Sequence, residues 1–165
     1  MRKMQFAEYE SPVGKLLLRS NGEALTGLWI GVKTDEQLGE DPVLLRTKMW
    51  LDAYFRGERP TMDIPVFMEG TAFQKAVWDQ LLKIPYGKTC TYGELAAALA
   101  KRFGKEKMSA QAVGQAVGRN PINILVPCHR VVGTRGALTG YGGGLPRKIR
   151  LLQQEGHIIE KDMVK

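Results

Sequence analysis

The chain has 165 residues, 44% apolar residues and a net charge of +7, which fits one compact domain or a small domain joined to a larger one. No apolar run approaches the roughly 20 residues of a membrane span, and the basic start of the chain lacks a signal peptide's apolar segment. We therefore expect a cytoplasmic protein. Its two cysteines and two histidines do not suggest a disulfide in a reducing compartment or a four-ligand zinc site.

The charge is divided unevenly along the chain. Residues 1–70 carry 9 Lys/Arg and 11 Asp/Glu, whereas residues 71–165 carry 15 Lys/Arg and 6 Asp/Glu. A basic half joined to a mildly acidic half favours a polyanionic partner, most simply nucleic acid. The alternative is that the basic surface serves only solubility.

The N-terminal part predicts a small antiparallel sheet followed by a helix. Short apolar runs with turn signals such as Asn21-Gly22 predict the sheet within the first thirty residues. Residues 43–56 repeat apolar side chains at helical spacing, and residues 61–67 predict an extended segment. We place the end of an N-terminal α/β scaffold domain at residue 69.

Residues 70–165 predict a mainly helical domain. Capping-box patterns begin helices at Thr71 and Thr91, and Pro146 suits the first turn of a last helix. Residues 124–127 predict an extended segment leading to Cys128. The predicted fold class is α+β: a small N-terminal antiparallel sheet plus helix, then a winged helix-turn-helix-like C-terminal domain.

Residues 92–102 and 109–118 form the candidate helix-turn-helix, although the connection is longer than the usual three to four residues. The second helix is rich in small and neutral side chains, unlike a helix that contacts base edges in the major groove. Small side chains permit close approach to a narrow minor groove. They equally permit tight packing against another helix, and both interpretations stay open.

The sequence Pro127-Cys128-His129 places a thiol beside a base. A thiol must lose its proton to act as a nucleophile, and its ordinary pKa of about 8.5 leaves little thiolate at neutral pH. In an extended segment the two side chains would point to opposite faces, so contact requires a bend or a bridging water. Glu155 is the best candidate to orient the histidine. The alternative is that Cys128 is a buried structural residue.

Residues 120–133, NPINILVPCHRVVG, resemble the active-site segment of the O6-alkylguanine-DNA alkyltransferases. The resemblance covers residues 71–156, whereas the first seventy residues match the family only in general plan. Further matching pieces follow in order: Phe73-Gln74, Val77-Trp78, Ile84–Lys88, Thr91-Tyr92, Ala112–Gly114, Leu138–Tyr141, Leu151-Leu152 and Glu155-Gly156.

This resemblance implies a repair protein that moves an alkyl group from the O6 atom of guanine to Cys128, irreversibly and once per molecule. It implies that His129 acts as the base through a water and that Glu155 orients His129. The other implied catalytic residues are Tyr92, which protonates the leaving guanine, Lys148, which assists nearby, and Asn120, which braces the active-site turn. The implied substrate-binding residues are Tyr141, Gly142 and Val131.

The resemblance also implies double-stranded DNA containing alkylated guanine as the partner. The second helix of the pair would lie in the minor groove, with the target base flipped out. Gln111 stands where many relatives carry an arginine that fills the gap left by the base. The DNA-binding residues that we expect are Ser109, Ala110, Gln111, Ala112, Arg119, Arg130, Lys101 and Arg102. We expect a monomer without cofactor, metal or membrane attachment.

Two other function classes compete with this interpretation. A regulator or lesion sensor of the same fold would bind damage without repairing it, but such relatives replace the reactive cysteine. A hydrolase using Cys128, His129 and Glu155 would turn over, whereas a repair protein of this kind would not.

Overall fold

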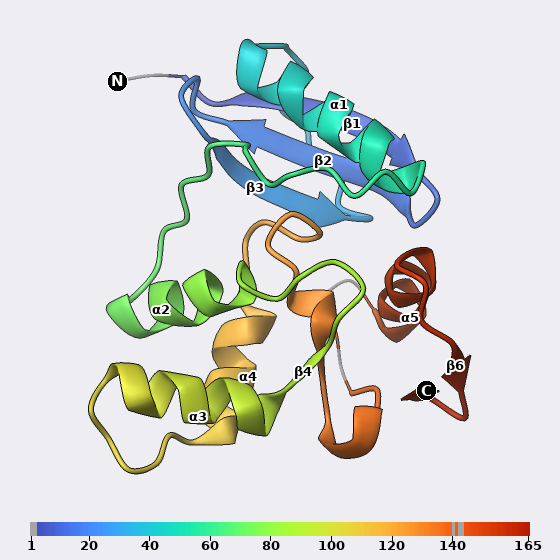
Figure 1. Ribbon diagram of the computed structural model, residues 1–165. Helices are drawn as coiled ribbons and strands as arrows, with labels where there is room; N and C mark the ends of the chain where they lie inside the picture. Colours follow the sequence, from blue (N-terminus) through green and yellow to red (C-terminus); the bar gives the residue numbers. More distant parts are fainter. Residues whose placement is uncertain (1–2, 140, 142–143) are drawn as a thin grey trace. The chain divides into compact units, whose positions relative to one another are not determined.

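The computed structural model describes residues 3–139, 141 and 144–165. It divides into two compact units (Figure 1). The first contains Met1–Met68 and Pro121–Leu125, and the second contains Glu69–Asn120 and Val126–Lys165.

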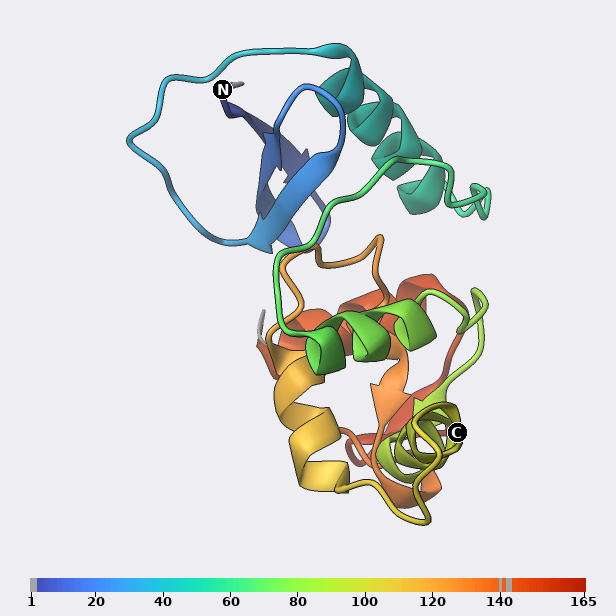
Figure 2. The same ribbon diagram turned by 90° about the vertical axis from the view of Figure 1, so that its left-hand side faces the viewer.

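In the first unit, β1 (Gln5–Ser11), β2 (Gly14–Ser20) and β3 (Leu25–Ile30) form an antiparallel sheet in that order. α1 (Pro42–Phe55) covers one face of this sheet (Figure 2). Asp41 caps α1 by accepting a hydrogen bond from the Leu44 amide at 2.8 Å, a typical N-cap contact. The predicted sheet and helix are confirmed.

Pro121–Leu125 joins the first unit, although we predicted residues 70–165 as one domain. The Leu28 amide donates to the Pro121 carbonyl at 2.9 Å, and the Asn123 amide donates back to the Leu28 carbonyl at 3.0 Å. These bonds attach the segment to β3. The predicted extended segment 124–127 is wrong at its start, because Ile124 has a φ of 72° within a run of turns.

The second unit is mainly helical. It contains α2 (Ala72–Leu81), α3 (Tyr92–Arg102) and α4 (Ala110–Gly118), which pack against one another. Both predicted capping boxes form, at Thr71 and at Thr91. The buried indole of Trp78 donates to the Ala116 carbonyl at 2.9 Å and so ties α2 to α4. The predicted helix pair is therefore present, with Ser109 as the N-cap of α4.

The rest of this unit consists of short strands, 3-10 helices and α5 (Leu145–Gln154), which contacts the 3-10 helix that begins at Cys128. β4 (Cys90–Thr91) pairs in parallel with β5 (Val131–Val132). The remaining elements are η1 (Cys128–Arg130), η2 (Thr134–Gly136), β6 (Ile159–Glu160) and β7 (Met163–Val164). The α+β class is confirmed. In the part of the chain that the structure describes, no helix is both long and apolar enough to cross a bilayer.

Candidate active site

Cys128 begins the short 3-10 helix η1 and is buried. The Cys128 amide donates to the Val126 carbonyl at 2.8 Å, and the Asn120 side-chain amide donates to the same oxygen at 2.8 Å. The chain therefore turns at the cysteine. An extended backbone, which would separate the Cys128 and His129 side chains on opposite faces, is excluded at η1.

His129 and Glu155 form a buried pair. The Nε2 atom of His129 lies 2.6 Å from a carboxylate oxygen of Glu155, and their exposures are 0% and 4%. Burial lowers the pKa of His129 despite the opposing effect of Glu155, so the imidazole is neutral at pH 7. Its Nδ1 atom is buried and has no hydrogen-bond partner among the described residues. His129 can therefore accept a proton at Nδ1 while Glu155 holds Nε2.

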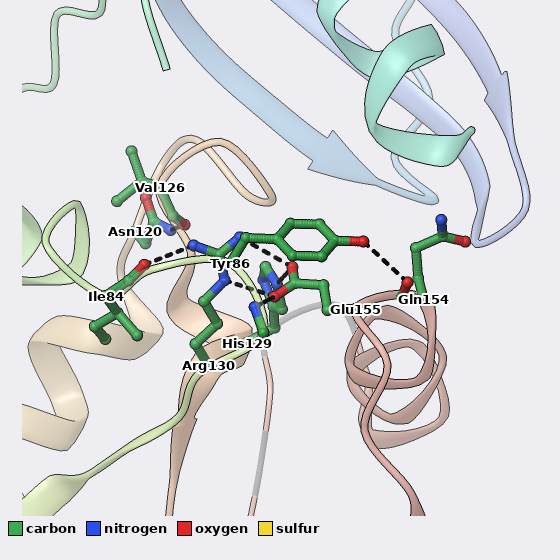
Figure 3. Close-up of polar contacts among 9 residues, drawn as sticks. Ile84, Tyr86, Asn120, Val126, His129, Arg130, Gln154 and Glu155 are labelled. Atoms are coloured by element: carbon green, nitrogen blue, oxygen red, sulfur yellow. Dashed lines mark hydrogen bonds and ion pairs between the residues drawn. The ribbon is translucent and has the colours of Figure 1, made fainter. Parts of the chain in front are cut away.

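Arg130 binds the same carboxylate (Figure 3). Its Nε and NH2 atoms donate to the two oxygens of Glu155 at 2.7 and 3.1 Å, and its NH1 atom donates to the Ile84 carbonyl at 2.7 Å. Burial raises the pKa of Glu155, but the bonds from His129 and Arg130 outweigh it and hold that pKa well below its ordinary value. Glu155 is therefore an anion that two side chains fix in place.

The predicted DNA contact of Arg130 is wrong. Its side chain is buried and fully engaged with Glu155 and Ile84, because a carboxylate buried beside a neutral imidazole needs a positive partner. Arg130 positions Glu155 instead.

The loop before β4 also contacts this network, and we predicted no role for this loop from the sequence. The guanidinium of Arg130 lies 5.8 Å from the centre of the Tyr86 ring, and the Tyr86 hydroxyl donates to the Gln154 carbonyl at 3.1 Å. The Gly87 amide lies 3.3 Å from a Glu155 oxygen and donates to it. The sequence signal that could have found this loop is Ile84–Lys88, which resembles the family's pattern.

Lys148 enters the site from α5. It is fully buried, and its ammonium group donates to the Thr139 carbonyl at 3.1 Å and lies 6.0 Å from the centre of the Tyr92 ring. The Thr139 hydroxyl in turn donates to the Tyr92 hydroxyl at 3.5 Å. Burial lowers the pKa of Lys148 to about 8. The lysine is thus still mainly charged at pH 7 and loses its charge not far above it.

Burial raises the pKa of the Cys128 thiol, and Asn120, Lys148 and Tyr141 act against that rise. The Tyr141 hydroxyl is also buried, and burial with the neighbouring Cys128 raises its pKa well above the ordinary value. Cys128 is therefore a protonated thiol at neutral pH. It requires a base at the moment of reaction, and His129, the next residue in the chain, is the candidate.

The other predicted site residues are distributed as follows. Val131 is fully buried in β5, and Gly142 lies outside the described residues. Ser109, Ala110, Gln111, Arg119, Lys101 and Arg102 are exposed, and Ala112 is half-buried. No group of three or more His, Cys, Asp or Glu side chains within residues 3–139, 141 and 144–165 is placed to hold a metal ion.

Comparison with known proteins identifies relatives of both units. The family models that match are "6-O-methylguanine DNA methyltransferase, ribonuclease-like domain" over residues 4–67 and "6-O-methylguanine DNA methyltransferase, DNA binding domain" over residues 72–157. Methylated-DNA--protein-cysteine methyltransferases of Mycobacterium leprae and Methanosarcina acetivorans are each 45% identical, over 91% and 93% of this chain and 91% and 99% of theirs. The crystal structure of Mycobacterium tuberculosis OGT in complex with DNA matches with a TM-score of 0.79 and 42% identity, over 92% of each chain.

Proposed function

Because the chain belongs to the 6-O-methylguanine DNA methyltransferase family, we propose that it repairs duplex DNA by moving an alkyl group from O6 of guanine to its own Cys128. The observation that carries this proposal is the buried His129–Glu155 pair, whose Nε2 and carboxylate oxygen lie 2.6 Å apart. His129 directly follows the buried Cys128 in the chain. A structural cysteine would need neither a neutral base beside it nor a fixed anion behind that base.

The thiol is activated by proton transfer to His129. The unpartnered Nδ1 atom of His129 takes the proton of Cys128 through one bridging water, and Glu155 stabilises the imidazolium that forms. The sulfur then attacks the alkyl carbon, so that an S–C bond forms and the O6–C bond breaks. A thiolate suits this attack because it is a strong nucleophile toward carbon.

The departing guanine needs a proton, and Tyr92 supplies it. Lys148 lies close to the Tyr92 ring, so its charge stabilises the tyrosinate that remains. The product on Cys128 is a thioether, which has no carbonyl for water to attack. Each molecule therefore acts once.

The DNA lies against the helix pair. α4 enters the minor groove with its small residues, while Lys101, Arg102 and Arg119, all exposed, contact phosphates. The damaged base flips out of the stack at a cost of a few kcal/mol, with Gln111 filling its place. Cys90 and Cys128 are both free, which fits the reducing cytoplasm, and we propose that the protein acts there as a monomer. The first unit serves as a scaffold.

A duplex carrying one labelled O6-methylguanine tests this function. We expect the label to move onto the protein in a single burst that stops at one label per molecule. Label that stays on bound DNA would indicate a lesion sensor, and label released over many turnovers would indicate a hydrolase. Either result would reject the proposal.

The pH dependence of the Lys148→Met variant tests the role of that lysine. The pKa of Lys148 is lowered to about 8, so its charge is present below pH 8 and lost as the pH rises through that value. We therefore expect wild type to exceed Lys148→Met by about tenfold or more below pH 8, and by a shrinking factor above it. Single-turnover transfer rates across this range measure the ratio.

Arg150→Met is the matched control, because Arg150 is an exposed cation on the same helix. The ratio of the wild-type transfer rate to the Arg150→Met transfer rate should not change near pH 8. A Lys148→Met ratio that is equally flat would remove Lys148 from the chemistry.

A further inference from the structure

α4 carries two exposed glutamines separated by one helical turn. Gln111 and Gln115 face solvent, whereas Val113, Ala116 and Val117 are buried. Within the described part of the chain, neither glutamine side chain makes a hydrogen bond. In the proposed function, Gln111 fills the gap that the flipped base leaves in the stack. No role has yet been given to Gln115.

Gln115 borders a hollow of about 260 Å³ between α4 and the start of α2. The other long amide there, Gln74, is already engaged, since its Oε1 atom accepts a hydrogen bond from the Thr71 amide at 3.0 Å. Gln115 is thus the unengaged amide of this hollow, and exposed Arg119 lies at its edge. A polar side chain free to bond and flanked by a cation is suited to a nucleic-acid surface.

The residues around Gln115 let α4 approach a partner closely. Ala112 and Gly118 are small, and a Cβ atom added to Gly118 would meet nothing within 4 Å. Gln115 is the long amide in the middle of α4, among these small side chains. In a minor groove, Gln115 can reach the base edges next to the place that Gln111 fills.

We propose that Gln115 recognises a G·C base pair beside the lesion, an inference that rests on the proposed placement of α4 in the minor groove. A glutamine amide has one acceptor and two donors. The minor-groove edge of guanine offers the acceptor N3 next to the donor N2 amino group, whereas A·T pairs offer acceptors alone. Only guanine therefore satisfies both ends of the amide.

The spacing on the helix predicts which base pair is recognised. Four residues of α-helix advance about 6 Å, and successive base pairs are about 3.4 Å apart. With Gln111 in the gap left by the flipped base and α4 running along the groove, Gln115 faces the first or second base pair on one side of that gap. The protein should therefore prefer lesions with a guanine at that step.

Inosine substitution tests this inference, because inosine pairs with cytosine but lacks the N2 amino group. A series of duplexes carries O6-methylguanine with one flanking guanine at a time replaced by inosine, and single-turnover transfer rates are measured on each. For wild type, we expect inosine at one position within two base pairs of the lesion to slow transfer about two- to tenfold. Dividing each rate by that of Gln115→Met removes the general effect of weaker inosine pairing.

Gln115→Met keeps the side-chain length but cannot form the paired hydrogen bonds, so it should lose this position dependence. Gln111→Met should slow transfer on all duplexes, but its transfer rate should still depend on the position of inosine. If wild type transfers the methyl group normally but is insensitive to inosine at every position, or if Gln115→Met keeps the effect, the inference is wrong and the proposed function stands. If wild type neither binds nor repairs any duplex, the proposed function itself fails.

Discussion

Cys128→Ser should abolish alkyl transfer, by at least about 10⁴-fold, and leave duplex binding largely intact. Serine fits the volume of the buried site, but its hydroxyl is far less acidic than a thiol and His129 cannot ionise it to a useful extent. Transfer of labelled methyl measures the first effect, and fluorescence anisotropy on a labelled duplex measures the second.

Cys90→Ser is the matched control for this variant. Cys90 is half-buried in β4 and takes no part in the His129–Glu155 network. The Cys90→Ser variant should transfer the methyl group and bind the duplex as the wild type does. An equal loss of DNA binding and transfer in Cys128→Ser would mean that Cys128 holds the fold and is not the nucleophile.

Glu155→Gln should cost both activity and stability. The change removes the anion from between His129 and Arg130, and it leaves the Arg130 charge buried without a counterion. Breaking a buried pair in this way costs about 3–5 kcal/mol of the free energy of unfolding. We expect the transfer rate to fall about 10²- to 10⁴-fold, since the base loses the group that orients and charges it. Denaturant unfolding and single-turnover kinetics measure the two losses.

The pH dependence of unfolding separates this account from a simple loss of packing. The pKa of Glu155 is held below its ordinary value in the folded protein, so its stabilising effect is fully present above about pH 4.3 and lost as the pH falls further. The stability difference between wild type and Glu155→Gln should therefore be constant near neutrality and shrink in acid.

Two further variants sharpen the comparison. Adding Arg130→Met to Glu155→Gln removes the unpaired charge, so it should recover part of the lost stability but none of the lost activity. Glu106→Gln, at an exposed carboxylate outside the site, should behave as wild type. Wild-type stability in Glu155→Gln would show that Glu155 does not hold Arg130 and His129.

The sequence predicted most elements because their signals are local. The capping boxes at Thr71 and Thr91 and the turn signals of the first thirty residues depend on neighbours within a few positions. The start of the extended segment before Cys128 was predicted wrongly, because Ile124 and Leu125 are buried in turns. A short buried apolar run has the same pattern in a strand and in a compact turn.

The site was predicted unevenly for a similar reason. The residue chemistry singled out Cys128, His129 and Glu155, and the resemblance gave them their roles. The structure brings His129 and Glu155 together. The sequence did not indicate that Arg130 is buried, because a surface arginine and a buried arginine look alike in a sequence. The bonds from Arg130 to Glu155 and Ile84 join residues far apart in the chain, and only the fold reveals them.

Peptide mass spectrometry of the reacted protein tests the central claim most directly. After reaction with a duplex containing O6-methylguanine and removal of the DNA, we predict one methyl group per molecule, carried only by the peptide that contains Cys128, and unchanged on prolonged incubation. Methylation of Cys90, or more lesions repaired than protein molecules present, would contradict it.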